Sequence, residues 1–278
     1  MKRFVLVLLV LGLVLSLAAG AFAAAVTIQR GTYGTVKDAY IRDNNSDEPG
    51  WDEDMNFGNP LDPYGLRVYG DGGGAAAGKG ERHMLVSFDL SFIPTGSTIN
   101  SATFGEYYWG GDRPDILGLK VSRLQSGKTW VEGTGDTAWQ DVGGFAVALN
   151  GEPTYNERMY GSGGWEIAGG TGATDIDLLT TKTYDLTGGD GFRTVNVTDF
   201  VNGWVNGGWA NNGMLLWGGG GTGTNSYWYE SVSEDGTVSL RPYLTVDYTE
   251  APVPEPSSLL AFGAFGIAGL GLIRRRRA

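Results

Sequence analysis

Short segments of alternating apolar and polar residues recur along the middle of the chain, separated by glycine, proline, asparagine and aspartate. A two-residue period places every second side chain on one face of a strand, so one face of each segment suits a core. The separating residues are typical of turns. Strands are therefore predicted over residues 35–41, 66–69, 84–90, 99–109, 117–122, 193–197, 214–217, 226–232 and 242–248.

One segment has a helical period instead. Thr198 is suited to cap a short helix that ends at the glycines 207 and 208, and its apolar residues are Phe200, Val201, Trp204 and Val205. Residues 130–191 contain Gly, Thr and Asp with isolated aromatics and no sustained period, which predicts mainly long surface loops with two weak strands; the stretch 143–191 is the glycine-rich segment. We expect one all-β domain over residues 26–250, a jelly-roll-like antiparallel β-sandwich with one short helix.

The N-terminus has the pattern of a secretory signal peptide. Lys2 and Arg3 precede an apolar stretch over residues 4–19, and Ala21-Phe22-Ala23 forms a small-x-small cleavage site. We predict a signal helix within residues 1–23, with a second cleavage frame at Ala23-Ala24-Ala25. The mature protein then begins near residue 24 or 26 and is exported.

The C-terminal residues 253–278 combine three features. Pro254, Glu255 and Pro256 disfavour helix and sheet, because proline fixes φ and lacks a backbone donor. The uncharged apolar run 259–273 predicts a transmembrane helix, although its length of about 22 Å is short for a hydrocarbon core of about 30 Å. The basic tail stays on the cytoplasmic side by the positive-inside rule; it consists of Arg274, Arg275, Arg276 and Arg277.

This order of features resembles the PEP-CTERM sorting signal of Gram-negative bacteria that make exopolysaccharide. The resemblance implies processing near Pro254-Glu255-Pro256 by an exosortase, a membrane-embedded cysteine protease or transpeptidase. It also implies a transient anchor in the inner membrane, followed by a location at the cell surface or in the extracellular matrix.

Charge and composition narrow the classes of partner. The chain has 20 Lys and Arg against 31 Asp and Glu, and six of the basic residues lie in the two terminal signals. So acidic a surface repels phosphates, which excludes nucleic acid and favours neutral glycans and calcium. The absence of cysteine excludes disulfides and thiol catalysis, and the single His83 excludes a multi-histidine metal site.

Separated blocks of the middle region resemble a DNRLRE-type domain, a carbohydrate-binding-module-like β-sandwich of bacterial and archaeal surface proteins. The resemblance implies a sandwich with a glycan-linked role. The blocks that carry it, in order, are residues 38–41, 56–58, 85–90, 93–94, 99–102, 130–132, 137–139, 197–199, 212–213 and 241–246, together with Trp204.

The acidic segment after residue 42 is a candidate calcium site. Asp43, Asn45 and Asp47 have the spacing of EF-hand ligands, with Asp54 at the twelfth position, but Glu48 stands where the loop needs glycine. A solvated acidic loop is the alternative. A looser site for a structural calcium ion would combine Asp38, Asp43, Asp52 or Asp54 with a distant carboxylate.

Aromatic residues are the candidates for glycan binding, because a flat ring covers the apolar face of a sugar. The triplets 107–109 and 227–229 each place at least one ring on the outward face of a strand, and Trp165 lies in the glycine-rich segment. Core packing is the alternative, and we assign Trp130, Trp204 and Trp217 to it. The candidates are Tyr108, Trp109, Trp165, Trp228 and Tyr229.

Three functions remain open. The first is a non-catalytic surface or matrix protein that binds exopolysaccharide in the envelope or biofilm. The second is a polysaccharide lyase or hydrolase, and the third is a structural envelope protein without a glycan site. The chain shows no nucleophile elbow, zinc-protease motif or phosphate loop, which favours the first over the second.

Overall fold

The computed structural model describes residues 23–43, 53–58, 66–69, 82–109, 119–135, 147–183, 189–218 and 227–251, with the backbone alone in 66–69 and 227–230. The predicted signal helix and transmembrane helix lie outside these residues. Among those described, no helix is long and apolar enough to cross a membrane.

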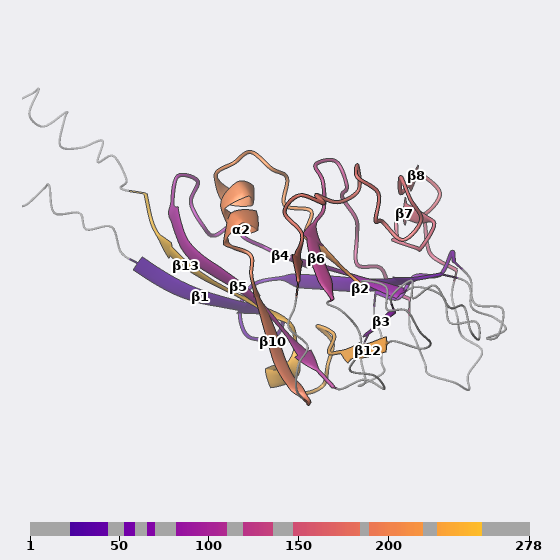
Figure 1. The fold of residues 1–278 in the computed structure, drawn as a ribbon, viewed down its shortest axis with the longest axis horizontal. Coiled ribbons are helices and arrows are strands. Elements are labelled where there is room, and N and C mark those ends of the chain that lie inside the picture. Colours follow the sequence, from indigo (N-terminus) through magenta and orange to yellow (C-terminus); the bar gives the residue numbers. More distant parts are fainter. Residues whose placement is uncertain are drawn as a thin grey trace, which may run out of the picture.

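The described residues form an antiparallel, mostly β fold with one α-helix (Figure 1). The helix α2 covers Thr198–Val205, and a 3₁₀ turn, η1, covers Val238–Leu240. The strands are β1 (Ala23–Gln29), β2 (Val36–Arg42), β3 (Leu66–Tyr69), β4 (Arg82–Phe88), β5 (Thr98–Tyr108), β6 (Lys120–Arg123), β7 (Glu157–Met159), β8 (Gly163–Gly164), β9 (Lys182–Thr183), β10 (Gly191–Asn196), β11 (Met214–Trp217), β12 (Tyr227–Glu230) and β13 (Tyr243–Thr249).

The large sheet has two halves. Strand order runs β1-β13-β5-β12-β3-β4-β11-β6-β9, while β10 also pairs with β5 and β2 also pairs with β4. The first half contains β1, β13, β5 and β10, and the second contains β2, β4, β11, β6 and β9. Strands β12 and β3 connect the halves, and β7 and β8 form a separate hairpin.

Both halves contribute to one main core, as in a β-sandwich. Phe104 and Leu244 from the first half are fully buried in the same cluster as Val86 and Met214 from the second. Phe200 of α2 packs into this cluster as well. The predicted antiparallel all-β fold with one short helix is therefore confirmed, and the shared core is consistent with a sandwich.

A second core lies on the other face of β2, β4 and β11. Leu85 and Leu215 are fully buried there against Trp130, Trp165 and Ile176, which come from the segments after β6. The described part of the glycine-rich segment is mainly irregular, with only the short strands β7, β8 and β9, as predicted. The prediction missed that Trp165 and Ile176 of this segment are buried. Its buried tryptophan and isoleucine cover a sheet face that would otherwise expose apolar side chains.

Two local predictions also need correction. Thr198 is the first helical residue rather than the N-cap, and its Oγ1 accepts a hydrogen bond from the Ala102 N–H at 2.9 Å. The hydroxyl therefore attaches α2 to β5. Strand β1 was not predicted, because its first residues overlap the predicted cleavage region of the signal peptide.

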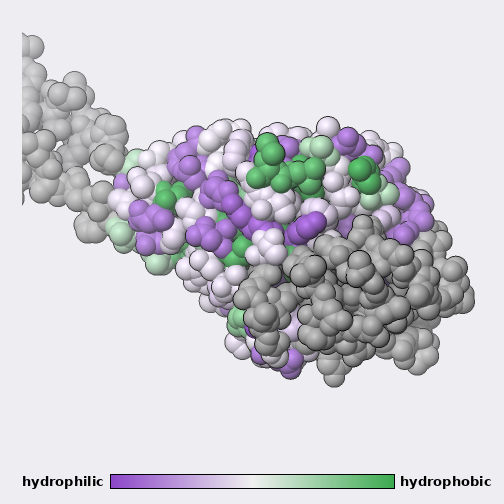
Figure 2. Space-filling view, in the orientation of Figure 1, coloured by the Kyte–Doolittle hydropathy of each residue, from purple (hydrophilic) through white to green (hydrophobic). Residues whose placement is uncertain are grey.

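On the face seen in Figure 2, the described residues show apolar groups as separate patches among polar ones. Scattered apolar residues are normal on a soluble protein surface. A binding surface must therefore be found from the arrangement of particular side chains.

Candidate functional site

The outward face of β5 and its neighbours gathers four aromatic residues. In β5 the residues Phe104, Glu106 and Tyr108 point inward and are buried, so the odd-numbered residues point outward. Strand register places Phe192 of β10 opposite Tyr107. It also places Tyr243 of β13 opposite Gly105. We call the outward set the aromatic face; it consists of Tyr107, Trp109, Phe192 and Tyr243.

The rings of the aromatic face form a continuous chain. Ring centroids lie 4.8 Å apart for Tyr107 and Trp109, and 5.3 Å apart for Tyr107 and Phe192. The Phe192 and Tyr243 centroids are separated by 5.2 Å. All three contacts are edge-to-face, the arrangement that aromatic quadrupoles favour by about 0.5–1.5 kcal/mol for each pair. The chain is also accessible, since Phe192 is 36% exposed.

Two local features hold these rings in place. A Cβ atom on Gly105 would lie 2.3 Å from the Tyr243 ring, so glycine is needed for that ring to lie over β5. At the other end, Trp109 Nε1 donates a hydrogen bond to Ser231 Oγ at 2.7 Å. A ligand therefore meets rings that are already ordered, which reduces the entropic cost of binding.

A row of polar side chains runs beside the aromatic face. Register aligns Thr27 of β1 with Thr245 of β13, Thr245 with Thr103 of β5, and Thr103 with Asn196 of β10. The Thr27 and Thr245 hydroxyl oxygens are 2.9 Å apart. The row offers hydroxyl and amide groups about 4.8 Å apart from strand to strand.

The structure separates the aromatic residues suggested by the sequence. Trp109 lies on the aromatic face, but Tyr108 points the other way and is 6% exposed. Trp165 is 8% exposed, and its Nε1 donates to the Thr154 carbonyl at 3.0 Å. Both are interior residues, so we remove them from the candidate glycan site. The side chains of Trp228 and Tyr229 in β12 lie outside the described residues.

Phe192 and Tyr243 were missed by sequence reasoning. Each stands on the polar side of its strand, opposite to the buried residues Val195 and Leu244. That position is readable from the two-residue period. Their proximity depends on the register between strands that are far apart in the chain, and the local sequence pattern does not determine this register.

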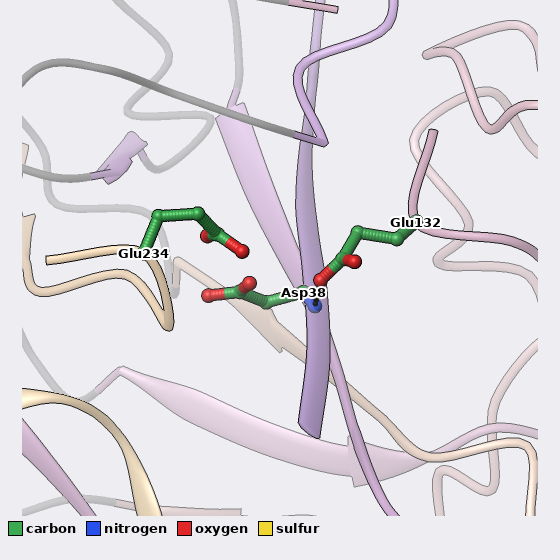
Figure 3. Close-up of side chains that lie close together, drawn as sticks. All are labelled: Asp38, Glu132 and Glu234. Atoms are coloured by element: carbon green, nitrogen blue, oxygen red, sulfur yellow. Dashed lines mark hydrogen bonds between the residues drawn. The ribbon is translucent and has the colours of Figure 1, made fainter. Parts of the chain in front are cut away.

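A second cluster consists of three carboxylates. Asp38 of β2, Glu132 after β6 and Glu234 after β12 have oxygens within 4.8 Å of one another. Figure 3 shows Glu234 and Glu132 approaching Asp38 from opposite sides. Asp38 is 1% exposed and accepts hydrogen bonds from Ser233 N at 2.8 Å and Ser233 Oγ at 2.6 Å. We call these three residues the carboxylate cluster.

The carboxylate cluster carries more negative charge than its neighbour compensates. The Arg30 guanidinium pairs with Glu132 at 2.6 Å and also with Glu234. Burial raises the pKa of Asp38 well above its usual range, and the negative charge of Glu234 raises it further. The hydrogen bonds from Ser233 act in the opposite direction but do not outweigh these effects. Burial also raises the pKa of Glu132, although the hydrogen bond from the Asp38 N–H and the charge of Arg30 act to lower it. A shared proton or a bound cation would relieve the excess charge.

The cluster overlaps only partly with the calcium ligands suggested by the sequence. Asp38 belongs to it together with two distant carboxylates, as in the looser site. Asp43 and Asp54 are not members, and Asn45, Asp47 and Asp52 lie outside the described residues. Oxygen ligands of this kind suit Ca²⁺ chemically, and the EF-hand-like arrangement stays a prediction.

Comparison with known proteins identifies the C-terminal signal. Residues 252–277 match the model of the PEP-CTERM protein-sorting motif. The chain is therefore an exported protein that is targeted to an exosortase. This match confirms the sorting signal that residues 253–278 indicate, including Pro254, Glu255, Pro256 and the four terminal arginines.

The family match does not extend to the region before the sorting motif. No curated protein matches the chain. The family match lies outside the blocks that suggested a DNRLRE-type domain, and no finding supports that resemblance. The function of the exported domain must be argued from its own surface.

Proposed function

We propose that the exported domain is a non-catalytic module that binds neutral polysaccharide at the cell surface or in the extracellular matrix. The observation that carries the proposal is the aromatic face, whose rings are accessible and ordered on adjacent strands. Its function is to hold the processed protein on exopolysaccharide.

The chemistry of this face suits a neutral sugar polymer. The C–H groups on one side of a sugar ring pack against Phe192 and Tyr243, while its hydroxyl groups pair with the adjacent polar row. Thr27, Thr103 and Thr245 carry no charge. The chain has a net charge of −11, which disfavours a highly anionic polymer.

Substitutions on the aromatic face test the proposal. We expect Phe192→Ala to weaken binding to immobilised neutral polysaccharides about tenfold or more, because one aromatic contact of about 1–2 kcal/mol is lost. Gly105→Ala should weaken it as well, since the new methyl group displaces the Tyr243 ring. The measurement is retention on a panel of neutral glucans, galactans and mannans.

A matched control separates this face from general surface hydrophobicity. Leu179 is 97% exposed in a loop away from the aromatic face, so Leu179→Ala removes an exposed apolar side chain elsewhere. It should leave polysaccharide retention unchanged. Equal loss in both variants, or no retention of the wild type by any neutral polymer, would refute the proposal in favour of a structural envelope protein.

The same experiment addresses the enzyme alternative. A lyase or hydrolase would shorten the polymer, whereas a binding module leaves its length unchanged. Within the carboxylate cluster, the burial of Asp38 disfavours direct contact of this carboxylate with a polymer. Size-exclusion analysis of the polymer after incubation therefore decides between binding and cleavage.

A further inference from the structure

The planes of the four rings on the aromatic face differ in orientation. The Tyr107 ring is inclined at 66° to the Trp109 ring and at 84° to the Phe192 ring. The Phe192 ring is in turn inclined at 61° to the Tyr243 ring. No two neighbouring rings of the aromatic face therefore share a plane. A flat ligand that lies on one ring meets the edge of the next.

The surroundings of the rings hold these orientations. Trp109 Nε1 donates to Ser231 Oγ at 2.7 Å, which fixes the indole at one end. At the other end the Tyr243 ring occupies the space that a side chain on residue 105 would fill. Between them each ring packs against the next by an edge-to-face contact. Turning the rings into one plane would give up these contacts.

The four rings also form a line along β5 rather than a broad surface. Trp109 follows β5, and Tyr107 is its outward residue two positions earlier. The Tyr243 ring lies over Gly105, two positions earlier again. Phe192 stands beside Tyr107 on β10, one strand away. The ring line is therefore one to two strands wide, or about 5–10 Å.

The polar row crosses one end of the ring line. The next outward residue of β5 beyond Gly105 is Thr103, about 7 Å further along the strand. Register places Thr245 of β13 on one side of Thr103 and Asn196 of β10 on the other. Apolar contacts are thus offered along the line, and hydroxyl and amide groups are offered at its Tyr243 end.

A crystalline polysaccharide and a dissolved chain require different protein surfaces. In the crystalline form the sugar rings of neighbouring chains make a flat layer, which is contacted best by several aromatic rings in one plane. A single dissolved chain turns from one sugar unit to the next, so rings of different inclination can each contact a unit. Inclined rings on a narrow line match the dissolved chain.

We propose that the aromatic face binds a single dissolved chain of a neutral polysaccharide and does not bind crystalline polysaccharide. The chain follows the ring line, with successive sugar units against differently inclined rings, and the unit at the Tyr243 end pairs with the polar row. This inference rests on the proposed function and narrows it to one physical form of the polymer. The protein is thereby held on hydrated matrix rather than on fibres.

Pairs of ligands that differ only in packing test the inference. Dissolved cellohexaose, chitohexaose and mannohexaose are compared with crystalline cellulose, chitin and mannan, and dissolved laminarin, pullulan and galactan extend the set of chains. We expect the exported protein to bind at least one dissolved chain saturably by calorimetry. Its adsorption to the crystalline powders should be weak and the same in the wild type and in Phe192→Ala.

Substitutions at the two ends of the ring line distinguish a chain that follows it from a ligand that lies on one ring. Trp109→Ala and Tyr243→Ala should each weaken binding of the dissolved chain about fivefold or more, because the chain contacts both ends. The melting temperature of each variant verifies that it is folded. If only Phe192→Ala weakens binding, the ligand touches a single ring and the inference fails.

Tyr33→Ala is the matched control for an exposed aromatic ring outside the aromatic face. Tyr33 is 46% exposed and makes an edge-to-face contact with Phe92, which in turn contacts the inward-facing Tyr248. The control therefore removes a ring on the opposite side of β13. It should change the affinity for the dissolved chain less than about twofold, and an effect as large as that of Trp109→Ala would contradict the inference.

The outcomes separate this inference from the proposed function. Adsorption to a crystalline powder that Phe192→Ala abolishes would overturn the inference, while binding of neutral polysaccharide through the aromatic face would stand. If neither the dissolved chains nor the powders are bound, the proposed function fails and the inference fails with it. Binding of a dissolved chain that Trp109→Ala and Tyr243→Ala both weaken, without specific adsorption to the powders, supports both.

Discussion

The two halves of the sheet use the same strand geometry in different ways. In β13 buried and half-buried residues alternate, whereas all seven residues of β4 are buried. The first half therefore has one face in the core and one face available to solvent. The second half is covered on both faces, by the main core and by the glycine-rich segment.

This difference explains why one half presents an accessible aromatic surface while the other is covered on both faces. The outward face of β5, β10 and β13 can present aromatic rings because nothing in the described structure covers them. The outer face of β4 instead carries Leu85, which requires Trp130 and Trp165 to cover it. One half supplies a surface, and the other supplies stability in a chain without disulfides.

The largest expected effect comes from truncating the doubly covered half. Leu85→Ala removes a fully buried side chain from the second core and should lower the free energy of unfolding by about 2–5 kcal/mol. Chemical denaturation measures this change. Leu179→Ala is the control, because its side chain is 97% exposed and should change stability by less than about 0.5 kcal/mol. Equal effects would contradict the comparison.

An intermediate effect is expected at the carboxylate cluster, which connects the halves through Arg30 after β1 and Asp38 in β2. If Ca²⁺ relieves the excess charge, saturating Ca²⁺ at about 100 times its dissociation constant should stabilise the wild type by about 2.7 kcal/mol. Glu234→Gln should largely remove this response, measured as melting temperature with Ca²⁺ and with EDTA.

Glu250→Gln provides the matched control for the calcium experiment, since Glu250 is an exposed carboxylate outside the cluster. It should retain the full response to Ca²⁺. A wild-type melting temperature that is the same in Ca²⁺ and in EDTA would contradict calcium binding at the carboxylate cluster. A shared proton would then be the compensating charge.

The smallest effect concerns the attachment of the glycine-rich segment to the second half. Asp177 pairs with Arg123 of β6 at 2.7 Å. Burial by itself would raise the pKa of Asp177, but the Leu179 N–H and the Arg123 charge outweigh it and lower the pKa. Because its pKa is lower in the folded state, Asp177 stabilises the fold at pH values above its ordinary pKa of 3.8. This stabilisation is lost as the pH falls through the pKa that Asp177 has in the folded state.

Asp177→Asn should therefore cost about 1–2 kcal/mol at pH 7 and progressively less below pH about 4. Denaturation at several pH values measures this dependence. Asp247→Asn, on the outward side of β13, serves as the control carboxylate. A cost that is independent of pH would show that the charge of Asp177 does not contribute.

Much of the fold was readable from local patterns. The period of residues 242–248 predicted β13 with its buried Leu244 and Val246, and the spacing of Phe200 and Val201 predicted α2. The terminal sorting motif was recognised because its prolines, apolar run and arginines follow one another in sequence. Local order is what a single sequence conveys best.

The candidate sites depend on contacts between distant residues, and these were only partly predicted. The sequence suggested Trp109 and Asp38 as candidates, but the residues that join them in the aromatic face and the carboxylate cluster, Phe192, Glu132 and Glu234, come from segments far along the chain. The burial of Trp165 was missed as well. Its surroundings have no period, and packing of an irregular segment onto a sheet leaves no local signal.

The pairing of the first and last strands sets an order of events during export. Strand β1 pairs with β13 from Ala23 opposite Thr249 to Gln29 opposite Tyr243, and the sorting motif begins at residue 252. The edge of the sheet is therefore completed only after nearly the whole domain has crossed the membrane. If the predicted signal peptide is removed, the position of the cut also matters: a cut after Ala23 would remove one of the seven pairs, whereas a cut after Ala25 would remove three. The cleavage site would then determine how firmly the last strand is held beside the sorting motif.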